Sequence, residues 1–98
     1  WPLWRTESAD AVMEHVKGYI KFCEGKKVDP FLCFYMHPWE FAPMPEGLLH
    51  YGEGAVMPDP FIIKNCGPYA TEQLDVLIDF LKARGSEFLQ ARQVSVTE

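Results

Sequence analysis

The sequence lacks any block of like charges. Its 98 residues carry a formal net charge of −5, and the lysines of its first third are spaced out along the chain. Binding to nucleic acid needs a concentrated basic face that neutralises phosphates, so we exclude nucleic acid as a partner. We interpret Lys17, Lys21, Lys26 and Lys27 as the solvated surface of one helix.

The sequence also lacks an apolar stretch long enough for a membrane span, and residues 1–5 do not have the pattern of a signal peptide. Its hydrophobic content of 48% and aromatic content of 14% nevertheless exclude a disordered tail. A chain this short buries only a modest part of its surface. We therefore expect burial against something beyond the chain. Because the sequence begins at Trp1 rather than Met, we expect a fragment, a processed product or one portion of a larger fold.

Paired cysteines are missing as well. The three cysteines form no C-x-x-C pair and leave an odd one, which argues against both a disulfide framework and a zinc ribbon. Reduced thiols favour a cytoplasmic protein, although a targeting segment could lie upstream. We expect Cys23, on an apolar helix face, and Cys33, in a buried run, to act as small hydrophobic side chains.

What the sequence does contain is an alternation of helices and strands. Ser8 or Thr6 is predicted to cap a first helix, which Gly25 ends. Thr71 is predicted to cap a second helix, which Gly85 ends. The apolar stripes at helical spacing are Ala9, Val12, Met13, Val16, Tyr19, Ile20 and Cys23 in the first helix, and Leu74, Leu77, Ile78 and Leu81 in the second.

Residues 31–37 form an unbroken apolar run between Pro30 and Pro38. Such a run predicts a strand buried on both faces, as in the centre of a parallel sheet covered by helices. Residues 61–63 and 87–89 are predicted to add short strands. Since these elements cannot cover the run completely, we expect residues 31–36 to be hydrogen-bonded to strands of another chain, of a symmetry copy or of a further segment.

His37 ends this run and is the main candidate for chemistry. Ligands of α/β folds bind beyond the carboxyl ends of the strands, and an imidazole there can act as a general acid or base. The alternative is a hydrogen-bonded structural histidine. We interpret His15 and His50 as bystanders. Residues 38–60 are too long for an ordinary connection, and they form either a functional loop over a pocket or a packing loop.

Two neighbours of His37 have several possible roles. Glu40 could orient the imidazole, bind a metal or accept hydrogen bonds from backbone amides. Trp39 could stack on a sugar or another planar ligand, or close one end of the core. The chain has no close histidine pair and no ordered Cys/His cluster, so we expect no complete metal site from its own residues.

Residues 34–41, Phe-Tyr-Met-His-Pro-Trp-Glu-Phe, resemble the late strand motif of the polysaccharide deacetylase family (NodB-homology, carbohydrate esterase family 4-like). Residues 60–67 and the helix around Gln73 resemble the C-terminal end of that family, so the resemblance covers nearly the whole chain. It implies an α/β fold in which residues 1–98 are the C-terminal part of a distorted, incomplete (β/α) barrel with parallel strands. The implied partner is the rest of the barrel or another chain, as in a homo-oligomer.

The resemblance also implies a function in carbohydrate metabolism, as part of a metal-dependent hydrolase that removes acyl groups from N-acylated carbohydrate or cleaves a related amide. A divalent metal, usually zinc, would be held by residues outside this chain, and the isolated chain would be inactive. His37 would protonate the leaving amine. Tyr35 stands where the family commonly has a leucine lining the acyl pocket, and Tyr35, Trp39 and Glu40 would contact substrate. The alternative is a non-catalytic carbohydrate- or protein-binding domain derived from the same fold.

Overall fold

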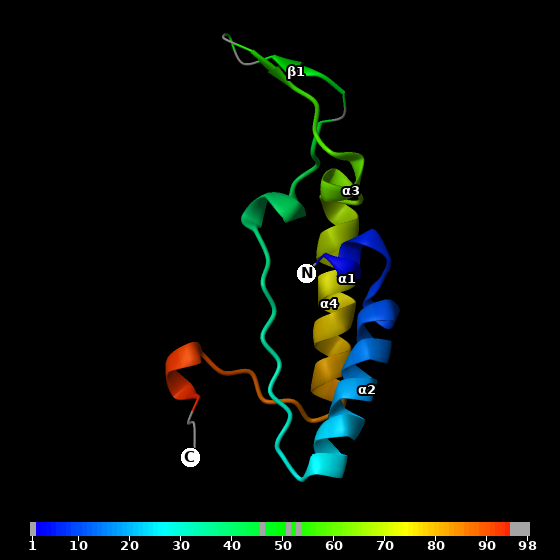
Figure 1. Cartoon of the computed structure of the whole chain (residues 1–98), viewed down its shortest axis with the longest axis vertical. Coiled ribbons are helices and arrows are strands. Elements are labelled where there is room, and N and C mark those ends of the chain that lie inside the picture. Colours follow the sequence, from blue (N-terminus) through cyan, green and yellow to red (C-terminus); the bar gives the residue numbers. More distant parts are fainter. Residues whose placement is uncertain (1, 46, 51, 53, 95–98) are drawn as a thin grey trace.

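Two long helices, α2 (Ala9–Lys26) and α4 (Pro68–Ala83), lie side by side and form the body of the molecule (Figure 1). This computed structural model describes residues 2–45, 47–50, 52 and 54–94. The short helix α1 (Leu3–Thr6) contacts both long helices. The remaining elements are the 3-10 helices η1 (Pro38–Phe41) and η2 (Ala91–Gln93), the strands β1 (Leu49–His50) and β2 (Ala55–Val56), and the helix α3 (Pro60–Ile63).

Helix α2 forms largely as the sequence predicts. The Ser8 side chain accepts a hydrogen bond from the backbone N–H of Ala11, which satisfies a donor that the first turn leaves free. The helix continues through Gly25 and ends at Lys26, where Lys27 takes the left-handed conformation (φ 57°). The predicted end of the helix at Gly25 is therefore two residues before the left-handed cap, and the cap residue is Lys27 rather than a glycine.

Helix α4 begins at Pro68, three residues before the predicted cap at Thr71. A proline at the first helical position loses no hydrogen bond, and its fixed φ suits the helix. Gly67 precedes it with φ 106°, and a Cβ at Gly67 would lie 3.1 Å from the backbone nitrogen of Pro43. A glycine is therefore needed here both for the turn into α4 and for the close approach of the chain that follows η1.

The hydrophobic core lies between α1, α2 and α4. The indole N–H of Trp4 is buried and donates a 2.9 Å hydrogen bond to the carbonyl of Ala70, which joins α1 to the first turn of α4. Buried side chains from both predicted stripes fill the space between the helices. The core consists of Trp4, Ala9, Val12, Met13, Val16, Ala70, Leu77 and Leu81.

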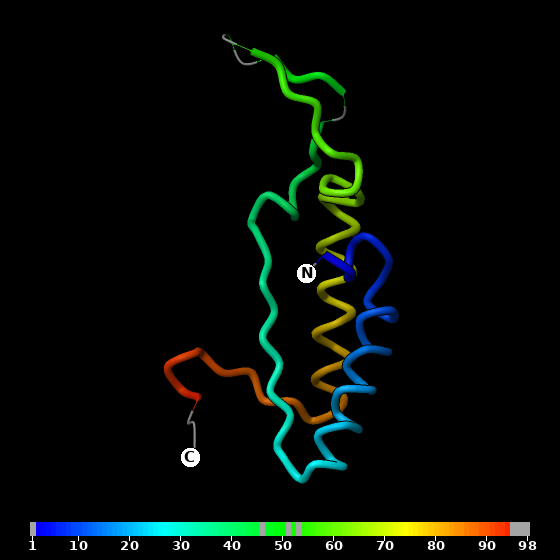
Figure 2. The backbone as a smooth tube through the Cα atoms, viewed as in Figure 1, coloured from blue at the N-terminus to red at the C-terminus, as the bar shows by residue number. Residues whose placement is uncertain are grey.

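The predicted barrel portion with parallel strands is wrong for this chain. Residues 31–37, called here the extended segment, run alongside the helices without pairing to a strand (Figure 2). In the described part of the chain, the only sheet is the antiparallel hairpin of β1 and β2, with Leu49 opposite Val56 and His50 opposite Ala55. Helices account for 54% of the described residues.

The burial of the extended segment is also one-sided. Leu32 and Met36 pack against the core, whereas Phe31, Cys33 and Tyr35 on the other face are exposed. An apolar run indicates that a segment favours burial, but it does not specify how many layers are available to cover it. Here the two long helices form one layer and reach one face only.

The two predicted short strands differ from expectation for local reasons. Residues 61–63 are helical because the Asp59 side chain accepts the N–H of Phe61 at 2.8 Å and Pro60 starts the turn. Residues 87–89 form neither a helix nor a strand, and they belong to no sheet among the described residues.

The resulting molecule is elongated, with extents of 55 × 27 × 19 Å and a radius of gyration of 17.2 Å. A compact domain of this length would have a radius of gyration of about 13 Å. No helix in the described part of the chain combines the length and the apolarity needed to cross a lipid bilayer.

Candidate functional site

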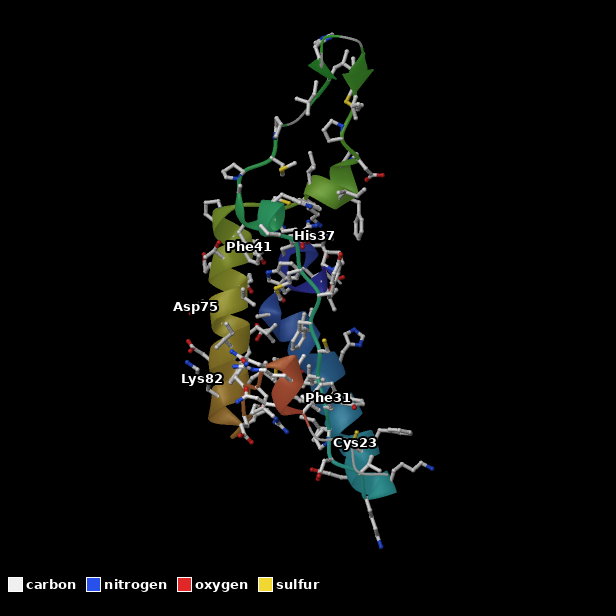
Figure 3. All side chains as sticks on the ribbon, turned by 90° about the vertical axis from the view of Figure 1, so that its left-hand side faces the viewer. Cys23, Phe31, His37, Phe41, Asp75 and Lys82 are labelled. Carbon is white, nitrogen blue, oxygen red and sulfur yellow. The ribbon has the colours of Figure 1, made fainter. Side chains whose placement is uncertain are left out.

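A pocket of ≈ 280 Å³ lies where the extended segment turns into η1. Figure 3 shows His37 at this turn, close to α1 and α3. Phe31 lies at the other end of the extended segment. The lining comes from α1, the extended segment, η1 and α3, and its walls are largely apolar and aromatic. It consists of Pro2, Arg5, Tyr35, His37, Trp39, Glu40, Phe61 and Ile62.

Arg5 supplies a buried positive charge at the centre of the hydrogen bonds of this site. Its side chain is 2% exposed, and its Nε donates to Oε1 of Glu40 at 2.8 Å. A terminal guanidinium nitrogen donates to the carbonyl of Lys64 at 2.7 Å, and the Arg5 carbonyl accepts from Nδ2 of Asn65 at 2.7 Å. These bonds connect α1 to η1 and to the loop before α4, so they hold α1 and η1, which both line the pocket, in fixed positions.

Glu40 uses both carboxylate oxygens. Oε1 accepts from Arg5, and Oε2 accepts the backbone N–H of His37 at 2.7 Å, which caps η1. The backbone carbonyl of Glu40 accepts from the N–H of Gly67 at 2.9 Å. Burial by itself would raise the pKa of Glu40, but the hydrogen bonds from the His37 amide and from Arg5, with the charge of Arg5, hold this pKa below its ordinary value. Glu40 is therefore an ionised, fully engaged carboxylate.

The His37 imidazole is held on several sides but remains accessible. Its side chain is 43% exposed, and Nδ1 lies 3.4 Å from Oε2 of Glu40. The ring stacks on Trp39 with centroids 5.1 Å apart and planes at 19°. The Tyr35 ring meets it edge-on, with centroids 4.8 Å apart at 82°. Glu40 therefore faces Nδ1, and Nε2 is the ring nitrogen left to face a ligand.

Trp39 has two neighbours of its own. Besides the stacked imidazole, the guanidinium carbon of Arg5 lies 5.8 Å from the centre of the indole ring, a cation–π distance. The four residues predicted for the site, Tyr35, His37, Trp39 and Glu40, thus come together around one pocket. Their catalytic and substrate-binding roles stay predictions.

Arg5 is the site residue that the sequence analysis missed. It lies 35 residues from Glu40 along the chain, and no local spacing connects the two. The sequence shows neither the burial of Arg5 nor its pairing with Glu40, because Glu7 is a nearer acid along the chain.

The Arg5 contacts with Glu40, Lys64 and Asn65 are called here the junction. Cys66 follows Asn65, and burial raises the pKa of its thiol, with the charge of Arg5 opposing the shift and that of Glu40 adding to it.

The residues of this site do not fit a metal by themselves. Among the described residues, no three His, Cys, Asp or Glu side chains come together in a group that could hold an ion. Of the described residues that line the pocket, Glu40 alone carries a carboxylate, and both of its oxygens already accept hydrogen bonds.

A comparison of the chain with protein-family models, with curated proteins and with solved structures gives no match. The resemblance to polysaccharide deacetylases therefore rests on the residues quoted for it and stays a prediction.

Proposed function

We propose that this chain contributes His37 as the proton donor of a hydrolase that cleaves an N-acyl group from carbohydrate or a related amide. One observation carries the proposal: an accessible imidazole is oriented by a buried carboxylate at the mouth of a pocket lined by aromatic residues. A general acid needs this combination of a fixed orientation and access to the substrate.

The chain's own residues supply the following step. After water has added to the acyl carbon of the substrate, the C–N bond breaks, the departing nitrogen takes the proton from Nε2 of His37, and the imidazole becomes neutral. Glu40 faces Nδ1 and fixes the ring, while Trp39 supports one ring face. Arg5 acts through Glu40, because it keeps that carboxylate ionised and in place. The divalent metal implied by the resemblance would have its ligands outside this chain and would polarise the acyl carbonyl and activate water.

A second candidate is a non-catalytic carbohydrate- or protein-binding domain. The observation in its favour is the apolar lining of the pocket, where Phe61 is 60% and Ile62 is 51% exposed beside Trp39. In this case His37 would serve only to hold the indole in position.

Substitutions distinguish the two candidates. They are made in the protein as it is produced in the cell, and the assay is release of acetate from an N-acetylated oligosaccharide. His37→Gln should lower kcat by about 10²- to 10⁴-fold and remove the alkaline decline of the rate, because the proton donor is lost. His15→Gln is the matched control, since His15 is an exposed residue of α2, outside the pocket.

The proposal fails if His37→Gln keeps the rate and its pH profile. The binding-domain candidate gains support if Trp39→Ala then abolishes binding of the same oligosaccharide, measured by calorimetry. Circular dichroism should show that each variant keeps its helices.

A further inference from the structure

One edge of the extended segment is already covered by a side chain. The Tyr19 hydroxyl of α2 donates to the carbonyl of Phe31 at 3.1 Å and accepts the N–H of the same residue at 3.3 Å. The hydroxyl thus takes the place that a neighbouring strand would occupy. In an extended chain, the N–H and C=O of successive residues point to alternate edges, so the edge that Phe31 shares with residues 33 and 35 faces α2.

The opposite edge has no hydrogen-bond partner among the described residues. The backbone groups of Leu32, Phe34 and Met36 point to it, and these three residues make no hydrogen bond within the described part of the chain. Residues 31–36 carry no charged side chain. A row of unpaired donors and acceptors at strand spacing matches another extended backbone, and an uncharged, apolar edge of this kind is a site for strand addition.

We propose that the opposite edge pairs antiparallel with the same edge of a second copy of this chain. The two-fold axis passes Phe34, so that Phe34 lies opposite Phe34 of the second copy and Leu32 lies opposite Met36 of the second copy. Each of these pairs exchanges both of its N–H···O=C hydrogen bonds. Every unpaired group on the edge then has a partner, and the covered edge at Tyr19 stays unchanged.

A second copy fits this edge for two further reasons. Residues that face each other in an antiparallel pair lie on the same face, and the register joins Leu32 to Met36, the two side chains that pack against the core. The two partly buried faces thus become one continuous layer. At each end, Asp29 lies diagonal to His37 of the second copy, which brings a carboxylate close to an imidazole.

The register is tested by cross-linking. Phe34→Cys in a Cys33→Ser background should form a disulfide with its own copy under mild oxidation, because paired residues lie about 5.5 Å apart at Cα, within the reach of a disulfide. Phe31→Cys in the same background is the matched control, since this position faces residue 37 and lies far from its own copy. Equal cross-linking of both variants, or none of Phe34→Cys, overturns the proposal.

The affinity is tested by sedimentation over a series of concentrations. The unsubstituted chain should dimerise, and Phe34→Lys should weaken the dimer at least tenfold because two ammonium groups then meet on the axis. Phe22→Lys, at a position on α2 that is 62% exposed, should leave the dimer unchanged. Circular dichroism at 222 nm confirms that each variant is folded. A wild-type chain that stays monomeric at about 100 µM, where a micromolar dimer would be saturated, overturns the proposal, as does a complex formed only with a strand of another protein.

Discussion

The junction around Arg5 and the extended segment meet at His37, yet they are held in opposite ways. At the junction, charged groups are buried and fully hydrogen-bonded, and no buried side-chain nitrogen or oxygen in the described residues lacks a partner. In the segment, aromatic side chains are exposed and part of the backbone is unpaired. In this comparison, the segments at the junction are held in place more firmly by polar groups with distant partners than the extended segment is by its apolar side chains.

The largest effect should come from breaking the junction. Arg5→Ala leaves the Glu40 carboxylate buried without its cation and the Lys64 carbonyl without its donor. Removing one partner of a buried ion pair costs about 3–5 kcal/mol, which is a large share of the stability of a small domain. Urea unfolding followed by circular dichroism should show this loss.

The matched control is the surface pair of Glu14 and Lys17, 3.5 Å apart and largely exposed. Solvent screens such a pair, so Glu14→Ala should change the free energy of unfolding by less than about 0.5 kcal/mol. Similar losses for Arg5→Ala and Glu14→Ala would contradict the role of the junction.

The next largest effect is the difference in lost stability between a substitution in the core and one in the extended segment. Leu77 is 1% exposed between the helices, whereas Phe34 is 43% exposed. Leu77→Ala should cost about 2–5 kcal/mol through lost burial and a cavity. Phe34→Ala should cost less than about 1 kcal/mol in the monomer, because much of the removed ring already contacts water. Thermal unfolding at low protein concentration measures both, and a larger loss for Phe34→Ala would reverse the comparison.

A smaller effect depends on pH. The pKa of Glu40 is lower in the folded chain than in the unfolded chain, so the unfolded chain binds this proton first as the pH falls. The stabilisation is complete above the ordinary glutamate pKa of about 4.3 and is lost as the pH falls through the lower, folded value. The stability difference between wild type and Glu40→Gln should therefore shrink below about pH 4. Urea titrations from neutral to acidic pH would measure it, and a constant difference would argue against an ionised Glu40.

The smallest effect concerns thiol reactivity. Burial raises the pKa of Cys66, so less of its thiol is ionised at a given pH, whereas Cys33 is exposed in the segment. In dilute protein, iodoacetamide should modify Cys33 before Cys66, and the rate at Cys66 should rise at a higher pH than for free cysteine. Peptide mass spectrometry assigns the two sites. Faster modification of Cys66 would mean that the junction opens readily.

The local pattern predicted much of the helical structure. The cap at Ser8 is confirmed in α2, and so is the stripe from Ala9 to Cys23 except at Tyr19, which is exposed. Leu77 and Leu81 are buried in α4 as its stripe predicts. Neither the sheet around residues 31–36 nor the burial of Cys33 is confirmed, because an apolar run does not show whether a second layer or a neighbouring strand is present. The hairpin of β1 and β2 lay within a loop without period, where no pattern indicated strands.

The sequence by itself determined the two long helices, their core-facing stripes and the placing of His37, Trp39 and Glu40 within four residues of one another, because helical periodicity and chain proximity are local properties. Only the tertiary structure decided that Arg5 pairs with Glu40, that the extended segment is covered on one face and that Tyr35 lies edge-on to His37. Partners 35 residues apart are selected by packing and by the need to satisfy buried charge. Both conditions arise only when the helices are brought together.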